Sequence, residues 1–250
     1  GINNTLEGTV EATEQYIKEL QSDSRFEGIH FKKSPGTGSA FPRLSVKVRP
    51  EIVSLKLGEE DVHPNQTTGN YVTADDLHEL FNSDEEFYII DMRNDYEHKS
   101  GHFKGSILAP LKNFRDLPEV IDQISHLKHK RVITACTGGI RCEKASGFLI
   151  EQGFTDVSQI YGGMVTYMEK YPNENFLGKL YVFDDRMLMG VNTDAPEHEV
   201  IGKCDLCAEE SENYVNCSRV SCHKHVICCE NCMVNGLPYC SQECIQLATA

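Results

Sequence analysis

Long apolar runs and positive charge are both scarce in this chain of 250 residues. No segment reaches the roughly 18 consecutive apolar residues that a membrane-spanning helix needs, so the sequence argues against a membrane protein. The chain starts at Gly1 without a basic stretch followed by an apolar one. We therefore see no export signal and expect a cytoplasmic location. Lys and Arg number 24 against 38 Asp and Glu, which gives a net charge of −14. Because nucleic-acid binding relies on Lys and Arg at phosphates, a nucleic-acid partner would need a local basic patch.

Cysteine, in contrast, is abundant: the chain has 11, of which two lie in its central part and nine lie between residues 204 and 244. Eight of the nine fall into four closely spaced pairs: Cys204 and Cys207, Cys217 and Cys222, Cys229 and Cys232, Cys240 and Cys244. In a chain without an export signal, repeated short spacings favour metal ligands over disulfides. Two thiolates on one tight turn can bind one tetrahedral ion, and pairs of pairs are typical of structural Zn²⁺ sites.

Four pairs allow two zinc sites, and a cross-braced arrangement would join the first pair to the third and the second to the fourth. Cys228, His223 and His225 are alternative ligands within the same region. The other interpretation of this region is a tail that is reduced and disordered, or partly linked by disulfides.

The central part of the sequence is organised around Cys136. Val132, Ile133 and Ala135 predict a buried strand, residues 143–152 predict a helix that Gly153 ends, and Cys136 to Arg141 form the loop between them. Backbone N–H groups of such a loop form an anion-binding nest, and the helix N-terminus adds positive potential. Both lower the pKa of a thiol and favour the reactive thiolate.

We therefore predict that Cys136 is catalytic and that the loop after it binds an anion or substrate; the loop residues are Thr137, Gly138, Gly139, Ile140 and Arg141. The alternative is a buried structural cysteine, which the glycine pair and Arg141 argue against because they are poor core filler. Arg141 is expected to face solvent and to hold loop carbonyls or an anion through its two-pronged guanidinium. Alternatively, it pairs with Glu143 and only keeps the loop in shape.

Cys142 lies in the first turn of the predicted helix. We expect its side chain to point into the domain and to be structural. A resolving role, in which it forms a disulfide with Cys136, is the alternative.

Strands and helices are expected to alternate from residue 71 to residue 170. Apolar runs indicate strands at 87–90, 105–108, 132–135 and 157–161, and periodic apolar positions indicate helices at 73–81, 117–127, 143–152 and 164–170. Thr73 and Asp76 form a near capping box at the first helix. The alternation predicts an α/β fold with a mainly parallel central sheet flanked by helices. Sites in such folds lie at the carboxyl ends of strands, where Cys136 falls.

The regions before and after this alternation have a different character. A helix is expected at 9–21, strands at 28–33, 44–48 and 52–57, a linker at 59–70, and a further strand at 179–183 ahead of the cysteine-rich region. The opening residues start in the middle of an element, so we expect a preceding strand in the longer protein. We divide the chain into regions 1–69, 70–176 and 177–250.

Several of these motifs resemble the rhodanese family of sulfurtransferases. Only four residues separate Cys136 from Arg141, whereas cysteine-dependent phosphatases have five, and the shorter loop resembles the rhodanese loop whose cysteine carries a persulfide. Residues 91–98 and 101–106 resemble the upstream rhodanese signature, Asp-x-Arg followed by Glu and Gly-His-Ile-x-Gly-Ala. Gly162 and Gly163 resemble the turn before the last rhodanese helix. Asp91 and Arg93 are expected to form an ordinary structural ion pair.

The whole layout resembles the bacterial rhodanese-domain tRNA uridine hydroxylases. That resemblance implies a ferredoxin-like or acylphosphatase-like N-terminal unit, a rhodanese domain and a cysteine-rich tail. It also implies that tRNA is the partner and that molecular oxygen converts wobble uridine to 5-hydroxyuridine. On this resemblance Cys136 matches the active cysteine, residues 137–140 match the loop whose amides stabilise its anion, and Arg141 matches the residue that closes the loop. The sequence shows neither a two-His-one-carboxylate triad nor a flavin fingerprint, so the hydroxylase expectation rests on resemblance alone.

Two alternative functions remain at the level of sequence. One is a sulfurtransferase that forms a persulfide with sulfur from thiosulfate or from a sulfur-donor protein. The other is a zinc-stabilised docking protein with a vestigial rhodanese fold. The intact Cys136 and Arg141 argue against the docking protein, since a vestigial domain needs neither.

Overall fold

A sheet of five parallel strands lies at the centre of the computed structural model, which describes residues 1–41, 43–222 and 224–249. The chain forms two units, Gly1–Ile52 with Phe183–Arg186, and Val53–Val182 with Met187–Ala250, and the sheet belongs to the second. None of the helices in the described ranges combines the length and apolarity of a membrane span.

The strands follow the order β1-β6-β5-β2-β4, which places β5 in the middle of the sheet. Their bounds are β1 Asn70–Val72, β2 Tyr88–Asp91, β4 Ile107–Leu108, β5 Arg131–Ala135 and β6 Asp156–Ile160. All neighbouring pairs are parallel, and Ile133 lies opposite Ile89 on β2 and Ser158 on β6. The predicted parallel sheet is confirmed. The strand expected at 105–108 is reduced to two residues at the sheet edge.

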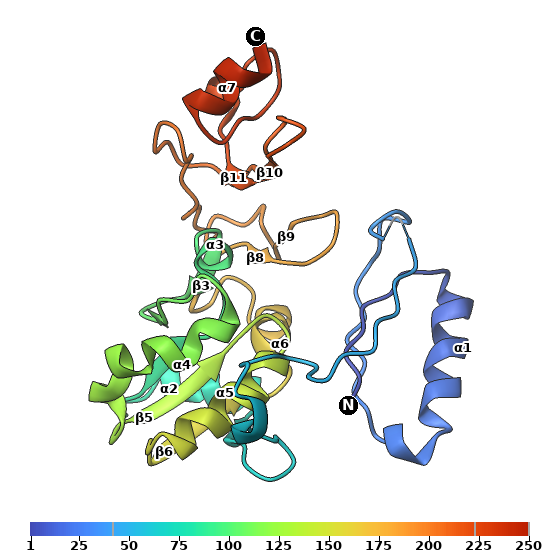
Figure 1. Cartoon of the computed structure of the whole chain (residues 1–250), viewed down its shortest axis with the longest axis vertical. Helices are drawn as coiled ribbons and strands as arrows, with labels where there is room; N and C mark the ends of the chain where they lie inside the picture. Colours follow the sequence, from blue (N-terminus) through green and yellow to red (C-terminus); the bar gives the residue numbers. More distant parts are fainter. Residues whose placement is uncertain (42, 223, 250) are drawn as a thin grey trace. The chain divides into compact units, whose positions relative to one another are not determined.

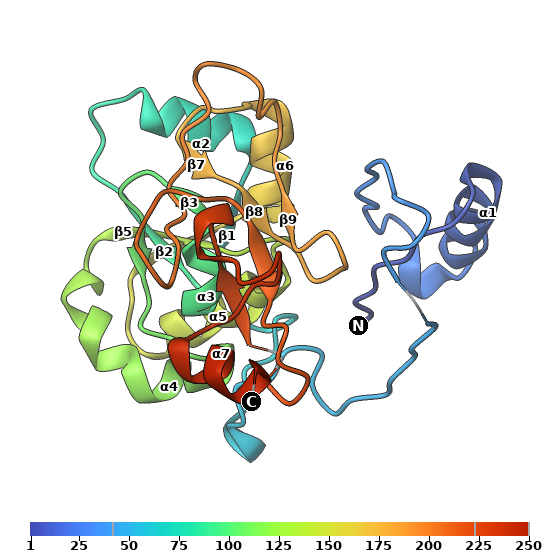
Figure 2. The ribbon, with the colours of Figure 1, turned by 90° about the horizontal axis from the view of Figure 1, so that it is seen from above.

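Helices cover both faces of the sheet (Figure 2). On one face lie α2 (Ala74–Phe81) and α6 (Gly163–Lys170), whose apolar residues pack against Ile133 and Ala135 of β5. On the other face lie α4 (Leu117–Val120), the 3₁₀ helix η4 (Ile121–Leu127) and α5 (Ile140–Glu151), which pack against Val132. A parallel sheet with apolar residues on both faces needs this double cover.

Two of these helices differ in detail from the prediction. The expected helix at 117–127 starts as α4 and continues as the 3₁₀ helix η4, although Ile121 and Ile124 do form its buried face. Helix α5 begins at Ile140 and not at Glu143, because Gly139 adopts a φ of 92° and caps the helix three residues earlier. The predicted capping box of Thr73 and Asp76 is present at α2.

The first unit has one helix, α1 (Val10–Gln21), which Thr9 caps. The strands predicted at 28–33, 44–48 and 52–57 are wrong, since the described residues there form no β-pairing. A strand exists only through a hydrogen-bonded neighbour, and Leu44, Val46 and Val48 are 92%, 85% and 99% exposed. Their alternation therefore predicted a half-buried strand that does not form.

The apolar pattern at 52–57 has another cause. Val53, Leu55 and Leu57 pack onto the core beside α5, and Leu55 is only 2% exposed. Lys144 of α5 reaches the same segment, and its Nζ donates to the carbonyl of Val53 at 3.0 Å and to Asp61 at 2.8 Å. This segment of the second unit is held by apolar packing and by the contacts of Lys144, and not by a β-ladder.

Short elements complete the chain (Figure 1). Antiparallel pairs join β3 (Gly101–Phe103) to β7 (Phe176–Gly178), β8 (Leu180–Tyr181) to β9 (Leu188–Met189), and β10 (Tyr214–Asn216) to β11 (His225–Ile227). The remaining helices are α3 (Asp95–His98) and α7 (Gln242–Thr249), with 3₁₀ turns η1 (Ser24–Phe26), η2 (Gly58–Glu60), η3 (Phe114–Asp116) and η5 (Glu230–Cys232). The strand predicted at 179–183 corresponds to β8.

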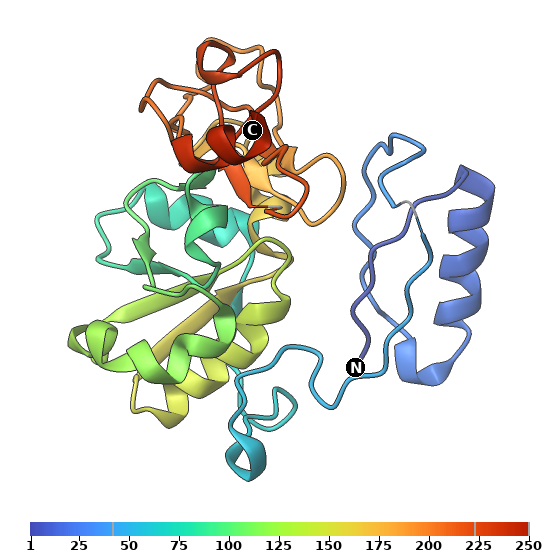
Figure 3. The ribbon, with the colours of Figure 1, turned by 45° about the horizontal axis from the view of Figure 1, so that its top comes forward.

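The cysteine-rich region packs against α3 and β8 (Figures 1 and 3). Tyr181 of β8, Tyr214 of β10 and Ile227 of β11 form a buried cluster, to which Tyr96 of α3 adds its ring. The hydroxyl of Tyr214 donates to the carbonyl of Tyr96 at 2.9 Å. An ion pair of 2.9 Å between Lys99 and Asp205 adds a second link.

Candidate active site and cysteine clusters

Cys136 follows the last residue of β5, the middle strand, and precedes α5. The loop carbonyls are held by the first turn of α6: the N–H of Met164 donates to Cys136 O at 3.0 Å, and the N–H of Val165 to Thr137 O at 3.1 Å. The hydroxyl of Thr137 donates to the carbonyl of Tyr181 at 3.5 Å. With its carbonyls turned to α6, the loop presents its N–H groups to the cysteine sulfur.

Glycine is required where the loop meets α6. Gly163 has a φ of 74°, and a Cβ there would lie 2.5 Å from the nitrogen of Gly139 and 2.7 Å from the carbonyl oxygen of Cys136. Only a residue without a side chain lets the two backbones approach so closely. The Gly162-Gly163 motif identified in the sequence thus contacts and supports the cysteine loop directly.

The side chain of Cys136 is buried, at 2% exposure, in surroundings that stabilise its anion. The N–H of Gly139 donates to its Sγ at 3.2 Å. Burial alone raises the pKa of the Cys136 thiol. The thiol of Cys142, the charge of Arg141 and the N–H groups of Cys142 and Arg141 outweigh burial and lower that pKa to about 6. Cys136 is therefore mostly thiolate at neutral pH.

Cys142 is fully buried and in contact with Cys136. Burial and the hydrogen bond with Cys136 raise the pKa of the Cys142 thiol well above its usual value, although Thr134 and Arg141 act in the opposite direction. The two thiols therefore differ: Cys136 is the anion and Cys142 is the hydrogen-bond donor to it. Cys142 does point into the domain, as expected from sequence, but it points at the other cysteine.

Arg141 does not face solvent, which corrects the sequence-based expectation. Its side chain is 14% exposed and makes a two-pronged pair with Glu97, at 2.6 and 2.7 Å. Glu97 belongs to α3, is itself fully buried and accepts the N–H of Asn94 at 3.0 Å. The alternative partner, Glu143, instead accepts the hydroxyl of Tyr71 at 3.2 Å. The guanidinium fork that we expected to hold an anion or loop carbonyls thus holds a carboxylate.

Glu97 is the site residue that sequence reasoning missed. The sequence did contain a signal for Glu97, because it is the glutamate that follows Asp-x-Arg in the upstream signature. The signature alone did not indicate what role this glutamate has. Asp91 and Arg93 of the same signature form the expected structural pair, with both side chains fully buried and Nη2 to Oδ2 at 2.7 Å. Arg93 also donates to the carbonyl of Gly101 at 2.6 Å. The pair fixes the end of β2 beside the cysteine loop.

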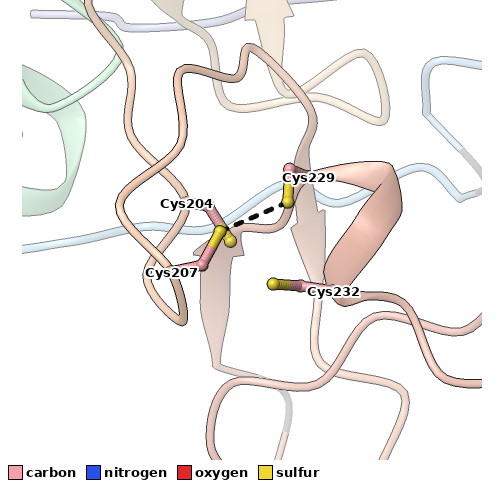
Figure 4. Close-up of side chains that lie close together, drawn as sticks. All are labelled: Cys204, Cys207, Cys229 and Cys232. Carbon is pink, nitrogen blue, oxygen red and sulfur yellow. Dashed lines mark hydrogen bonds between the residues drawn. The ribbon is translucent and has the colours of Figure 1, made fainter.

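The eight paired cysteines gather into two sets, Cys204, Cys207, Cys229 and Cys232, and Cys217, Cys222, Cys240 and Cys244. In each set the four sulfurs lie within 4.8 Å of one another. This grouping is the cross-braced one, first pair with third and second with fourth. All eight thiols are free of disulfides. Figure 4 shows the first set, with the four side chains converging from two separate turns of the chain.

The sulfur spacing fits a tetrahedral ion. Zn–S bonds of about 2.3 Å place the sulfurs of a tetrahedral site about 3.8 Å apart, whereas a disulfide measures about 2.05 Å. The sulfur–sulfur separations are 3.5 Å for Cys207 and Cys229, 3.6 Å for Cys222 and Cys240, and 3.4 Å for Cys240 and Cys244. Cys204 Sγ in addition accepts backbone N–H groups of Leu206, Cys207 and Cys229, as the thiolates of such turns do.

Two of the three alternative ligands, Cys228 and His225, are not part of either set. Cys228 is buried outside both, and His225 uses its Nδ1 for the hydroxyl of Tyr181 at 2.8 Å. His223 lies outside the described residues. Within the described part of the chain, these two sets are the groups of His, Cys, Asp and Glu that could hold a metal ion.

Comparison with known proteins shows which family has this combination of domains. The family described as rhodanese-like domain matches residues 73–170, rhodanase C-terminal matches 177–245, and the UPF0176 acylphosphatase like domain matches 1–52. A curated tRNA uridine(34) hydroxylase of Bacillus cereus (strain B4264) is 44% identical over 247 residues, which are 98% of this chain and 76% of that protein. This chain belongs to the tRNA uridine(34) hydroxylase family. The hydroxylase of Bacillus thuringiensis (strain Al Hakam) has the same identity and coverage.

Among solved structures, a rhodanese-like domain from Anabaena sp. is 21% identical, covers 44% of this chain and 80% of that one, and has a TM-score of 0.38. The family membership agrees with the acylphosphatase-like, rhodanese and cysteine-rich layout that the motifs indicated. The cysteine loop at the end of β5 is the candidate active site, because it combines a thiolate with N–H donors and a buried arginine.

Proposed function

We propose that this chain hydroxylates uridine 34 of tRNA to 5-hydroxyuridine with molecular oxygen, and that Cys136 is the reacting residue. The observation that carries the proposal is the 44% identity to curated hydroxylases over 98% of the chain. The site supports it, because a cysteine with a pKa of about 6 is a nucleophile at neutral pH. We place the enzyme in the cytoplasm, where its tRNA substrate is found.

The loop residues have separate roles in this proposal. The N–H of Gly139 stabilises the sulfur anion, and Thr137, Gly138 and Ile140 shape the turn that presents it. Arg141 adds positive charge near the sulfur while Glu97 fixes its position. Arg141 is thus a positioning residue whose charge acts on Cys136.

The test is mass spectrometry of tRNA from cells that lack the gene. We expect 5-hydroxyuridine at position 34 to disappear, to return with the wild-type chain and to stay absent with Cys136→Ser. Lys130→Ala is the control, because this exposed residue pairs with Glu86 away from the loop and both cysteine sets, and it should restore the modification. Unchanged tRNA, combined with a loss of thiosulfate:cyanide activity, would favour the sulfurtransferase alternative, with thiosulfate or a sulfur-donor protein as its source.

We also propose that each cysteine set binds one structural Zn²⁺. The support is the sulfur spacing, the donor set of four thiols and the cross-braced grouping of the cysteine pairs. A site closed by four protein ligands keeps no open position for a substrate, which is typical of structural zinc. We therefore assign zinc to the stability of region 177–250. The other two regions of the proposed division are the N-terminal region 1–69 and the rhodanese region 70–176.

A further inference from the structure

The hydroxylation proposed above has an electron balance that the substrate alone cannot meet. Reducing molecular oxygen to one hydroxyl group and one water takes four electrons. Conversion of the uracil C5–H bond to C5–OH provides two of them. The other two must come from a donor, and the inference that follows rests on the proposed function because it identifies that donor.

The donor chemistry is present beside the reacting sulfur. Cys136 and Cys142 are both buried, at 2% and 0% exposure, and both are bound to Gly139, whose N–H donates to Cys136 Sγ at 3.2 Å and whose carbonyl accepts the N–H of Cys142 at 3.0 Å. Each thiol also shifts the pKa of the other. Neither belongs to the two cysteine sets that could hold a metal. Two thiols in contact are a two-electron donor, because they give up two electrons and two protons when they form a disulfide.

We propose that Cys136 and Cys142 supply the two missing electrons and finish each hydroxylation as a disulfide. The C5–H bond of uracil, the O–O bond and the S–H bond of Cys142 break, and one proton from solvent is taken up because Cys136 reacts as the thiolate. A C5–OH bond, one water molecule and one S–S bond form. One oxygen atom enters the base and the other enters water, so the reaction of the uracil, O₂, one thiolate, one thiol and one proton balances without any further reductant.

The surroundings of the two cysteines suit unequal roles. Cys136 receives the N–H of Gly139 and is held as the anion, while Cys142 also contacts Thr134 and keeps its proton. The thiolate is the reactive form in disulfide chemistry, and the unequal pKa values make Cys136 the sulfur that supplies it. The sulfurs must close from hydrogen-bond contact to a bond of about 2.05 Å. The backbone between them includes Gly138 and Gly139, the residues with the fewest steric restrictions.

The next turnover needs the disulfide reduced. A small thiol or dithiol can do so by exchange, in which two thiols of the reductant become a disulfide and both cysteines return to the thiol form. Turnover should therefore depend on a thiol reductant in a way that the first reaction does not.

The experiment uses the full chain, reduced and freed of reductant without air, and then mixed with excess unmodified tRNA and oxygenated buffer. We expect one 5-hydroxyuridine per chain and, in the same sample, a Cys136–Cys142 disulfide seen as a loss of two hydrogen atoms in the peptide mass. Added dithiothreitol should restore continued turnover. Cys142→Ser should lose both the product and the disulfide, while the control Lys130→Ala, an exposed residue paired with Glu86, should retain them.

Product formed while both thiols stay free, or many products per chain without reductant, would overturn the inference and leave the proposed function standing. No product from the wild-type chain even with dithiothreitol would overturn the proposed function and the inference with it. Should Cys142→Ser fail to fold, the ratio of product to disulfide in the wild-type chain decides the question by itself.

Discussion

A buried thiol is normally inert, since burial disfavours its anion. Cys136 departs from this because N–H groups and the charge of Arg141 converge on its sulfur from the first turn of α5. The sequence predicted this effect from the order of strand, glycine loop and helix. It could not predict Glu97 as the partner of Arg141, because the two residues are 44 positions apart and meet only when α3 packs beside the loop.

The pKa of Cys136 gives a direct prediction. Because the pKa is lowered to about 6, the thiolate fraction should rise through that pH and be nearly complete at pH 7. Alkylation by iodoacetamide, followed residue by residue by mass spectrometry, should reach half its maximal rate near pH 6 at Cys136. Cys142, whose pKa is raised, should react slowly throughout. A midpoint for Cys136 near the free-thiol value of about 8.5 would contradict the role of the loop.

Arg141→Ala should lower the stability of the fold as well as the activity. It leaves the fully buried Glu97 unpaired, and breaking a buried pair costs about 3–5 kcal/mol. Urea unfolding followed by circular dichroism measures this cost, and Arg141→Ala combined with Glu97→Gln should recover part of it. Lys170→Ala is the matched control, because its pair with Asp75 is half exposed and should contribute at most about 1 kcal/mol. An unchanged urea midpoint for Arg141→Ala would show that the pair contributes nothing to folding.

At the scale of elements, the rhodanese region was predictable and the N-terminal strands were not. Strands β2, β5 and β6 each contribute apolar residues to the clusters on both faces of the sheet, so their local pattern and their packing agree. The run at 44–48 has the alternation of a strand, but β-pairing depends on a neighbour that the local pattern does not contain. Helix α5 begins earlier than predicted because the positive φ of Gly139 sets its start. No side-chain cap, which the sequence could have shown, is involved.

The contact between the cysteine loop and α6 can be tested with two glycines. Gly163→Ala places a Cβ 2.5 Å from the nitrogen of Gly139, so it should destabilise the fold and displace the loop. Gly153→Ala is the matched control, because its φ of 88° is also positive but nothing lies within 4 Å. The control should cost about 1–2 kcal/mol from the backbone conformation alone and leave hydroxylation unchanged. Equal losses of stability and activity in the two variants would contradict the close approach.

At the scale of the whole molecule, the two cysteine sets should respond differently to the loss of metal. Metal analysis of protein purified without chelator should find two zinc ions per chain, and binding energy of ~10–16 kcal/mol per site becomes folding energy of such a region. Cys232→Ser should remove the ion of the first set and Cys240→Ser that of the second. A metal-free protein whose tail remains protected from proteolysis would exclude zinc as the source of order.

The two variants should differ in activity as well. The first set adjoins Asp205, which pairs with Lys99 and accepts the N–H of Ile227 at 3.2 Å, and Ile227 packs on Tyr181 beside the cysteine loop. The second set packs mainly within its own cluster with Tyr239 and Ile245. Hydroxylation should therefore fall in Cys232→Ser and persist in Cys240→Ser. Equal activity in the two variants would show that the first set does not support the loop.

The position of Asp205 would make the activity of the enzyme depend on one of its two proposed ions. A chain that loses only the ion of the second set would keep its tRNA modified while its tail frays. A chain that loses the ion of the first set would lose support for the cysteine loop, through Tyr181 and the carbonyl that accepts the Thr137 hydroxyl. The state of the wobble base would then report the occupancy of the first set and not the total zinc content of the protein.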